Sequence, residues 1–440
     1  MSSQTNTYSL GDITTLITDG KHGDCKNEKD SGYYFLSVKD ITEDRLNYKK
    51  ARQIKKIDFD ETDKRTNLQP EDILFTNTGT IGRMAIAPDN ELTRKTTFQK
   101  SVAIIKPKKD VVFPKYLFYL LKKENKRLCM FAEGTTQKNL LLKDLRSFPI
   151  GKIPELDYQK AIAHVLGTLD TKIELNKKTH ETLEEIAKTL FKSWFIDFNP
   201  VKAKSEGRST GLPDEISALF PDSFEDSELG EIPKGWSCGE IQDLCEWVSS
   251  GGTPSRSNKE YWNNGNISWF KTGELKDSLL FDSLENINEL AIKNSSCKLW
   301  EKGTILFAIY ASPTVGKLGV LTKDGTCNQA AAGLKAKEEI GTAFLRRCLL
   351  FSRKKLQNIA VGAAQQNINV QILKQHQIII PNDNLPSLYS SLVLSLDSKQ
   401  EVILREILYL EELRDTLLSK LISGELRISD AEKIIGEALI

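Results

Sequence analysis

LGTLDTKIELNKKTHETLEEIAKTL, residues 166–190, decides the fold, because the chain repeats its pattern as VLSLDSKQEVILREILYLEELRDTL at 393–417. In both stretches apolar residues recur at alternating spacings of three and four, which is typical of helices that pair along a heptad seam. The pattern predicts two long helices packed antiparallel as a coiled coil, each a rod of roughly 60 Å for about 40 residues. The predicted seam consists of Ile162, Leu166, Leu169, Ile173, Leu183, Leu190, Val393, Leu396, Ile403, Leu410, Leu417 and Leu421.

Two polar residues, Asn176 and His180, interrupt this seam. Polar residues at seam positions can set the register of a helix pair. They can equally face a partner subunit, and the sequence leaves both interpretations open.

The helices belong to a larger internal repeat. LGDITTL at 10–16 returns as CGEIQDL at 238–244, DILFTNTGTIGR at 72–83 as TILFAIYASPTVGK at 304–317, and GTTQKNLLLKDL at 134–145 as GAAQQNINVQIL at 362–373. The offset between copies stays between 227 and 234 residues, far longer than the roughly 20–50 residues of a solenoid repeat. The chain is therefore a tandem duplication of one large unit, which predicts two similar sites on an extended or pseudo-symmetric partner.

Each copy begins with short β-rich runs, turn residues and a helical run, without βαβ regularity. The predicted fold class is α+β, with two similar mixed α/β domains joined by two long antiparallel coiled-coil helices in a pseudo-two-fold internal repeat. The predicted organisation is a first globular domain at 1–152, a first long helix at 153–198, a connector at 199–234, a second globular domain at 235–381, a second long helix at 382–425 and a C-terminal tail at 426–440.

Composition narrows the possible functions. The net charge is +1, but residues 1–150 carry 27 Lys plus Arg against 20 Asp plus Glu. This excess is typical either of a solvated surface or of a surface that faces phosphates. Seven cysteines without a CxxC pair predict free thiols in a reducing cytoplasm, and four isolated histidines predict no metal site. No apolar stretch reaches the length of a membrane span.

Common catalytic motifs are absent from the sequence. There is no GxxxxGK[ST] phosphate loop, no GxSxG elbow and no HExxH pair, and FNPVKA at 198–203 lacks the second proline of an adenine-methyltransferase motif. We therefore predict no catalytic residue and no cofactor. A dispersed metal-nuclease site built from the abundant carboxylates stays open.

Recognition of a partner is the function that remains, and DNA is one candidate partner. Gln and Asn side chains pair with adenine edges, and Lys and Arg contact phosphates. Equivalent polar turns and loops in the two copies carry such residues, and a basic cluster surrounds residue 52. The candidate DNA-binding residues are Lys21, His22, Lys49, Arg52, Lys55, Gln137, Lys138, Ser255, Arg256, Lys259, Tyr261, Gln365 and Gln366. Ordinary surface loops, a solvated strand edge and helix capping by Asn139 and Asn367 are the alternatives.

The whole chain resembles the specificity subunits of type I restriction–modification systems. The resemblance rests on the duplicated layout, on the LDTK and LDSK motifs, and on three strings. These are WFIDFNPVKAK at 194–204, LPDEISALFPDSFEDSELGEIPKGW at 212–236 and LLSKLISGELRI at 417–428. It implies two target-recognition domains that each read half of a split site in double-stranded DNA. It also implies a helical spacer that docks two modification (methyltransferase) subunits.

In such a complex, methyl transfer from S-adenosylmethionine and ATP-driven translocation and cleavage are expected to belong to the modification and restriction subunits. The chain would then be a cytoplasmic DNA-binding subunit without a membrane segment. Two alternatives stay open: a single-chain restriction–methylation enzyme with a cryptic site, and a structural coiled-coil scaffold.

Overall fold

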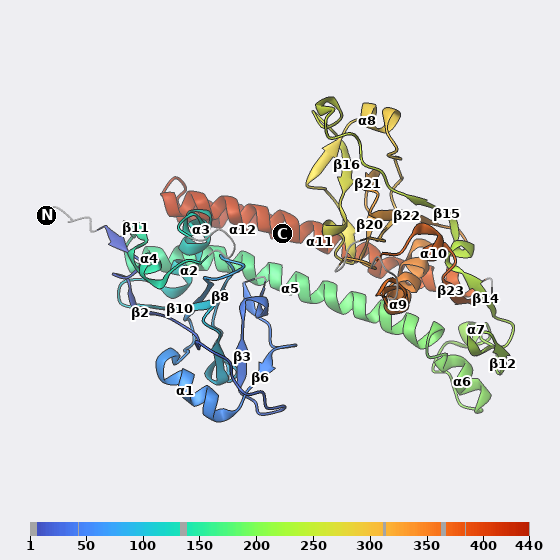
Figure 1. The fold of residues 1–440 in the computed structure, drawn as a ribbon, viewed down its shortest axis with the longest axis horizontal. Helices are drawn as coiled ribbons and strands as arrows, with labels where there is room; N and C mark the ends of the chain where they lie inside the picture. Colours follow the sequence, from blue (N-terminus) through green and yellow to red (C-terminus); the bar gives the residue numbers. More distant parts are fainter. Residues whose placement is uncertain are drawn as a thin grey trace. The chain divides into compact units, whose positions relative to one another are not determined.

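The computed structural model describes residues 7–42, 44–132, 139–310, 314–361, 367–382 and 384–439. Its internal contacts divide the chain into unit 1, Met1–Leu175 with Ile407–Ile440, and unit 2, Asn176–Glu406. Each unit combines one mixed α/β domain with part of two long helices, α5 (Leu156–Phe195) and α11 (Leu385–Ser423) (Figure 1). Among the described residues, none of the helices has both the length and the apolar composition that a bilayer crossing requires.

The domain of unit 1 is built on two small sheets. A four-stranded antiparallel sheet has the order β2-β10-β7-β8, and a three-stranded sheet has the order β6-β3-β9. Leu36 and Phe98 of the second sheet share a buried cluster with Leu74 and Ile104 of the first, so the core lies between the sheets. In Figure 1, α2 faces α5 and α1 lies at the far end of the domain.

The strands of unit 1 are β1 (Tyr8–Ser9), β2 (Thr14–Asp19), β3 (Tyr34–Leu36), β4 (Ile41–Thr42), β5 (Arg45–Leu46), β6 (Arg52–Gln53), β7 (Ile73–Thr76), β8 (Met84–Ile86), β9 (Thr96–Phe98), β10 (Val102–Pro107) and β11 (Pro149–Gly151). Its shorter helices are α1 (Lys56–Thr66), α2 (Pro114–Lys123), α3 (Asn125–Met130), α4 (Leu142–Ser147) and α12 (Ile428–Ala438).

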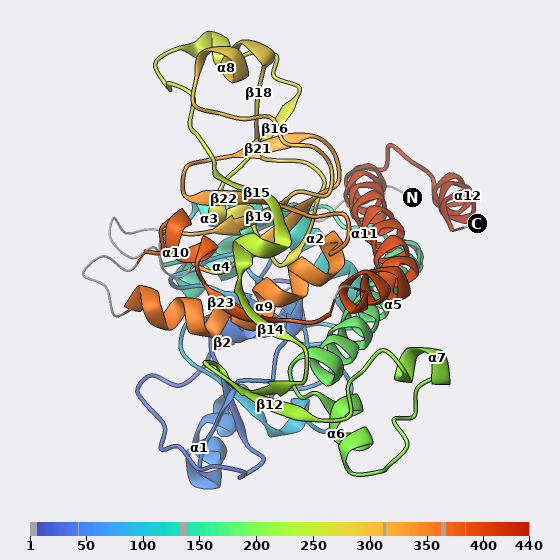
Figure 2. The same cartoon turned by 90° about the vertical axis from the view of Figure 1, so that its right-hand side faces the viewer.

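Unit 2 repeats this arrangement. Its larger sheet has the order β15-β22-β19-β20-β17, and its smaller sheet has the order β18-β16-β21. Figure 2 shows the smaller sheet and α8 on one side of the larger sheet.

The strands of unit 2 are β12 (Phe224–Ser227), β13 (Gly230–Pro233), β14 (Ser237–Glu240), β15 (Cys245–Ser250), β16 (Ile267–Phe270), β17 (Ser278–Leu280), β18 (Glu285–Ile287), β19 (Ile305–Ala308), β20 (Leu318–Leu321), β21 (Gly325–Cys327), β22 (Ala331–Ala336) and β23 (Gln377–Ile380). Its shorter helices are α6 (Asn199–Ser205), α7 (Asp214–Ser217), α8 (Glu289–Asn294), α9 (Thr342–Val361) and α10 (Val370–Lys374).

The main sheets of the two domains have the same strand order. The order β2-β10-β7-β8 corresponds to β15-β22-β19-β20, and in both smaller sheets the first and last strands in sequence pair in parallel. The larger sheet of unit 2 adds β17, which pairs in parallel with β20. Outside the main sheets, the β4–β5 pair belongs to unit 1 and the β12–β13 hairpin to unit 2. The predicted internal repeat of α+β domains is confirmed.

Helices α5 and α11 lie where the heptad pattern predicts helices. Of the predicted seam, Leu183, Leu190 and Leu396 are half-buried. The remaining seam residues, Ile162, Leu166, Leu169, Ile173, Val393, Ile403, Leu410, Leu417 and Leu421, are buried. Gly424, with φ +76°, ends α11 because the left-handed conformation after a helix favours glycine.

Within unit 2 the two helices run antiparallel. With its amide oriented to satisfy both atoms, Gln400 bonds to the backbone and carboxylate of Glu184 at 3.3 Å each. The hydroxyl of Tyr389 donates to the carbonyl of Ala187 at 2.8 Å, so a later residue of α5 meets an earlier one of α11. Within unit 1, Asp170 of α5 accepts from Arg414 of α11 at 3.0 Å.

Neither of the two polar seam residues is fully exposed. Asn176 is only 6% exposed. His180 is half-buried, and burial lowers the pKa of its imidazole. Asn176 thus fits a register-setting role better than a place on the surface of the coiled coil.

The segment 199–234 is more ordered than the sequence indicated. It forms α6, α7 and the β12–β13 hairpin, and Phe220 and Ile232 are buried in the same cluster as Trp194. The rings of Trp194 and Phe220 are 5.1 Å apart. Its prolines and glycines therefore shape a packed part of unit 2 rather than a loose linker.

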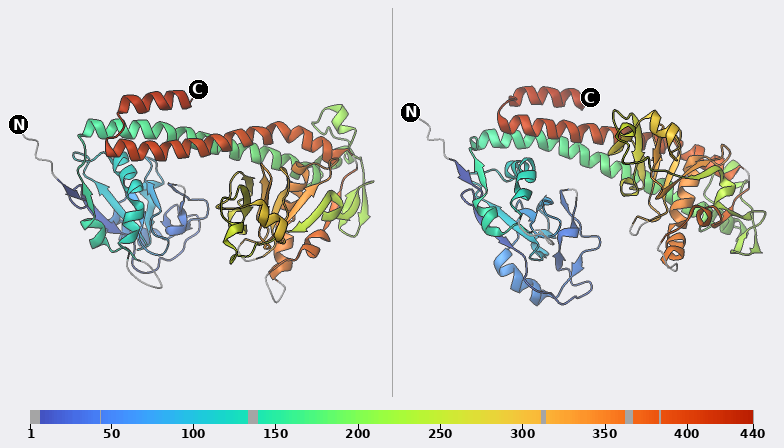
Figure 3. Two further views of the ribbon diagram at one scale, coloured as in Figure 1. Left: turned by 90° about the horizontal axis from the view of Figure 1, so that it is seen from above. Right: turned by 45° about the horizontal axis from the view of Figure 1, so that its top comes forward.

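The chain after α11 is a helix and not an extended tail. Beyond Gly424 it turns back, and α12 lies along α11 within unit 1 (Figure 3). Ala431 and Ile435 of α12 are buried, as its amphipathic spacing requires.

Candidate nucleic-acid interface

One end of the larger sheet in unit 1 collects polar loops. Because β10 is antiparallel to both β2 and β7, the ends of β2 and β7 meet the start of β10 at the same edge. The backbone N–H of Lys100 donates to the carbonyl of Lys21 at 3.1 Å, and that of Asn77 donates to Ser101 at 3.0 Å. We call Lys21, Asn77 and Gln99–Ser101 the polar edge of unit 1.

A glycine brings these loops into contact. Gly20 follows β2, and a Cβ at this position would lie 1.9 Å from the carbonyl oxygen of Phe98. Only glycine allows the two backbones to approach so closely. The loop that begins at Lys21 is therefore pressed against the turn at Gln99.

Unit 2 builds the same edge from different side chains. A Cβ at Gly251 would lie 2.3 Å from the carbonyl oxygen of Asn328. The backbone N–H of Ile309 donates to Ala330 at 2.9 Å, as that of Asn77 donates to Ser101 in unit 1. We call Thr253, Ile309 and Asn328–Ala330 the polar edge of unit 2; there the hydroxyl of Thr253 bonds the amide oxygen of Gln329.

Both edges hold buried polar atoms without a hydrogen-bond partner. Asn77 Oδ1, Ser101 Oγ and Asn328 Oδ1 have no partner among the described residues. An unsatisfied buried polar atom costs about 1–3 kcal/mol. Such atoms are few in native proteins, and strain, ordered water or a bound polar group accounts for them.

The candidates at the start of the first loop differ in availability. Lys21 Nζ pairs with Glu61 at 2.9 Å and with Asp58 at 3.2 Å, and the bond to Glu61 is the main cause of the raised pKa of this lysine. His22 has a side chain that is 61% exposed, and its Nε2 lies 3.0 Å from Asp19 Oδ2. Lys21 thus holds the loop onto α1, whereas His22 faces solvent.

The basic cluster around residue 52 divides in the same way. The guanidinium of Arg52 donates to Asn27, Asp24 and the carbonyl of Cys25, each at 2.9 Å. Lys49 and Lys55 are exposed. Arg52 stabilises the loop at 24–27 with all of these bonds. Lys49 and Lys55 are therefore the members of this cluster that can contact phosphates.

The second loop carries its candidates around a tryptophan pair. The guanidinium of Arg256 lies 3.7 Å from the ring centroid of Trp262 and pairs with Glu285 at 2.6 Å. The hydrogen bond from Arg256 is the main cause of the lowered pKa of Glu285. Ser255 and Lys259 are exposed, and Tyr261 is half-buried against the smaller sheet.

The remaining candidates, Gln137, Lys138, Gln365 and Gln366, lie outside the described residues. The capping alternative needs correction. Asn139 accepts from the hydroxyl of Thr78 at 2.8 Å and does not cap α4, whose N-cap is Leu141. Asn369, not Asn367, caps α10 by accepting from the backbone of Ile372.

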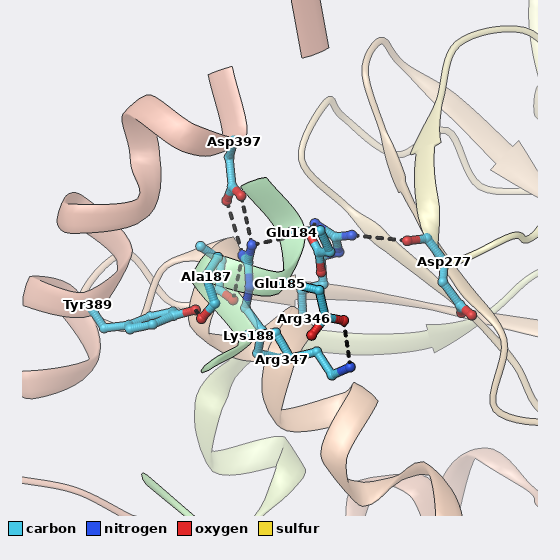
Figure 4. Close-up of polar contacts among 10 residues, drawn as sticks. Glu184, Glu185, Ala187, Lys188, Asp277, Arg346, Arg347, Tyr389 and Asp397 are labelled. Carbon is cyan, nitrogen blue, oxygen red and sulfur yellow. Dashed lines mark hydrogen bonds and ion pairs between the residues drawn. The ribbon is translucent and has the colours of Figure 1, made fainter. Parts of the chain in front are cut away.

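The repeated LDTK and LDSK motifs hold each domain onto the helices. In unit 1, Asp170 accepts from the hydroxyl of Tyr119 on α2 and from Arg414 on α11. In unit 2, Asp397 receives Arg347 of α9 at 2.8 and 3.1 Å (Figure 4). Residues 119 and 347 are 228 apart, so equivalent positions of the repeat bind equivalent aspartates.

The arginine of unit 2 also reaches the other long helix. Arg347 is fully buried, and its guanidinium lies 3.5 Å from Glu184 of α5, which also pairs with Arg346 at 3.3 Å. Burial lowers the pKa of Arg347 more than any single contact raises it. The hydrogen bond and charge of Asp397, with the charges of Tyr389 and Glu184, together outweigh burial, so the net shift is upward. One charged cluster thus ties α9 to both α5 and α11 (Figure 4).

Comparison with known proteins agrees with this architecture. The family described as "Type I restriction modification DNA specificity domain" matches twice, at residues 3–185 and 233–405. The HindI specificity subunit of Haemophilus influenzae is 26% identical, over 95% of this chain and 99% of that protein. The MjaIX specificity subunit of Methanocaldococcus jannaschii is 30% identical, over 81% of this chain and 78% of that protein.

A solved structure shares the fold. The S subunit of the type I restriction–modification system of M. genitalium superposes with a TM-score of 0.53 at 16% identity, covering 96% of this chain and 97% of that one. The two family matches coincide with the two copies found in the sequence and in the topology. The chain therefore belongs to the family of type I restriction–modification DNA specificity subunits.

Proposed function

We propose that this chain reads a two-part target in double-stranded DNA, one half-site per domain, for a cytoplasmic type I restriction–modification complex. The observation that carries the proposal is that two domains of one topology present the same polar edge with different side chains. Equal scaffolds with unequal side chains suit the reading of two different sequences, because specificity comes from side chains at base edges.

The long helices suit the docking of two modification subunits. Leu175 of α5 and Val402 of α11 occupy equivalent positions, 227 residues apart, and are 59% and 65% exposed. Single exposed apolar side chains are common on protein surfaces, but their recurrence at equivalent positions of the repeat supports a shared role in docking. An equivalent pair, one in each unit, fits two copies of the same partner.

A second candidate docking surface lies on α5 within unit 2, where Ile186 and Leu190 are the apolar members of a mostly polar lining. The residues at 178–193 that share one face line an open groove of about 980 Å³, in which Ile186 is 50% exposed. A modification subunit would cover this face. The restriction subunits would join the complex through the modification subunits or through other surfaces of the chain.

We further propose that methyl transfer and cleavage belong to these partners and that this chain supplies no catalytic residue. The competing proposal of a single-chain enzyme requires that the chain bind S-adenosylmethionine. The competing proposal of a scaffold requires that the chain have no influence on DNA binding.

The test is reconstitution from purified subunits. Together with its modification subunit, the chain should methylate DNA at a defined motif and bind that DNA in a salt-dependent way. Binding of S-adenosylmethionine by the chain alone would favour the single-chain enzyme. Unchanged DNA binding when the chain is left out of the complex would favour the scaffold.

A further inference from the structure

The turn that leads into the second strand of each larger sheet occupies the same place in both units. In unit 1 the backbone N–H of Gln99 donates to the carbonyl of Leu36 at 2.9 Å, at the end of β3. In unit 2 the N–H of Asn328 donates to Phe270 at 2.9 Å, at the end of β16. The dipeptides Gln99–Lys100 and Asn328–Gln329 are therefore structural equivalents.

These turns lie at the centre of each polar edge. Gly20 and Gly251 press the loop after the first strand against them, as the absence of room for a Cβ shows. The neighbouring strand borders each turn on the other side. After β7 of unit 1 the N–H of Asn77 donates to Ser101, and after β19 of unit 2 the N–H of Ile309 donates to Ala330. A ligand that meets this edge of the sheet would meet the turn.

One side chain in each turn, Lys100 in unit 1 and Gln329 in unit 2, is exposed and can bond to a ligand. Lys100 is exposed and forms no ion pair with any described residue, unlike Lys21, which is paired twice. Gln329 is exposed, and the hydroxyl of Thr253 occupies only its amide oxygen. The amide nitrogen of Gln329 thus remains to donate.

We infer that Gln99–Lys100 and Asn328–Gln329 are base-reading elements, one for each half-site; this inference rests on the proposed function. Gln and Asn bond bidentately to the N6 and N7 of adenine, and Lys donates to the O6 and N7 of guanine. The two turns present different donor sets on the same backbone, which is what two different half-sites require. The exposed Lys100 and Gln329 are the side chains of these turns that can reach a base edge without any rearrangement.

The test uses the reconstituted complex and sequencing of the bases that it methylates. One variant carries Gln99→Ala with Lys100→Gln, and the other carries Asn328→Ala with Gln329→Ala. Matched controls are Lys109→Gln, which lies beyond the other end of β10, and Gln242→Ala, which lies before the start of β15. Each variant should relax one half-site only, with discrimination at the affected base pairs reduced about 5- to 150-fold, the factor that a bidentate contact supplies.

An unchanged motif with unchanged discrimination would overturn the inference, and so would weaker binding that is equal at every sequence. If a double variant fails to assemble, the single exposed substitutions Lys100→Gln and Gln329→Ala are judged by the same criterion. Exchange of residues 1–152 for the domain of a relative separates the two levels of the account. If the exchange changes one half-site but the turn variants have no effect, only the inference about the turns is wrong. If neither the exchange nor the turn variants change the methylated motif, the proposed function is wrong.

Discussion

At the scale of single residues, the buried charges of unit 2 do more for the fold than the exposed ones. Arg347 has no exposed side-chain surface and three carboxylate contacts, whereas the Lys323–Asp282 pair has side chains that are 50% and 81% exposed. An exposed pair contributes about 0–1 kcal/mol, because water screens it. A buried charge that loses its partner is far more costly.

Arg347→Ala should lower the free energy of unfolding of unit 2 by about 3–5 kcal/mol, because Asp397 loses its counter-charge and Glu184 keeps only Arg346. Lys323→Ala should lower it by about 0–1 kcal/mol. Denaturant unfolding of both variants measures the difference. Equal small losses would show that the cluster does not hold α9 to the long helices.

The basic cluster around residue 52 can be dissected in the same way. Lys49→Gln with Lys55→Gln should weaken binding at all DNA sequences and lower the slope of log K against log salt by about 1 for each lysine that contacts a phosphate. Arg52→Ala should instead lower stability by about 0.5–1.5 kcal/mol, because the part-buried carbonyl of Cys25 loses its donor. An unchanged salt slope in the double lysine variant would place these lysines on an ordinary solvated surface.

The residue scale is also where the sequence was least informative. The sequence marked Lys21 and Arg52 as DNA-binding candidates. It could not show that they pair with Asp58 and Asp24, because these are tertiary contacts that no local pattern reveals. It missed Gln99–Lys100 and Asn328–Gln329, because a polar dipeptide in a turn has no periodicity. An alignment of FQKSV at 98–102 with CNQAA at 327–331 was the one signal that could have found them.

At the scale of elements, periodic sequence was enough. Alternating spacings of three and four predicted two long helices close to their observed bounds. The connector was harder, because its prolines and glycines resemble those of a linker. Only the three-dimensional structure shows that Phe220 and Ile232 of the connector belong to the core of unit 2.

The docking proposal makes a prediction about these elements. Leu175→Ser and Val402→Ser should each remove one modification subunit from the complex, and the double variant should remove both, because each site loses an exposed apolar contact. Leu284→Ser is a suitable control, since Leu284 is 84% exposed but lies outside the long helices. Native mass spectrometry reports the stoichiometry; a double variant that keeps both partners would place the docking surface elsewhere.

At the scale of the whole molecule, the duplication links architecture to the length of the DNA target. If each domain reads one half-site, as we propose, the length of the paired helices should contribute to the spacing of the half-sites. The contact of Glu184 with Gln400 places Thr179 opposite the region of Arg405, so both helices can be lengthened at matched positions.

Insertion of four residues after Thr179 and four after Arg405 would add about 6 Å of helix and roughly 40° of rotation beyond one turn. Coiled coils absorb an insertion of this size by local unwinding. The variant should methylate sites whose spacer is longer by about one or two base pairs, at 3.4 Å each, with both half-sites unchanged. Full activity at the original spacer would show that the helices do not set the distance.

The central claim is that each domain reads one half-site independently. Its most direct test is the exchange of residues 235–381 for the corresponding domain of a relative with a different target, followed by sequencing of the methylated bases in cells that express the complete system. The account predicts that one half of the motif changes to that of the donor while the other half and the spacer stay the same. A change in both halves, or in neither, would contradict it.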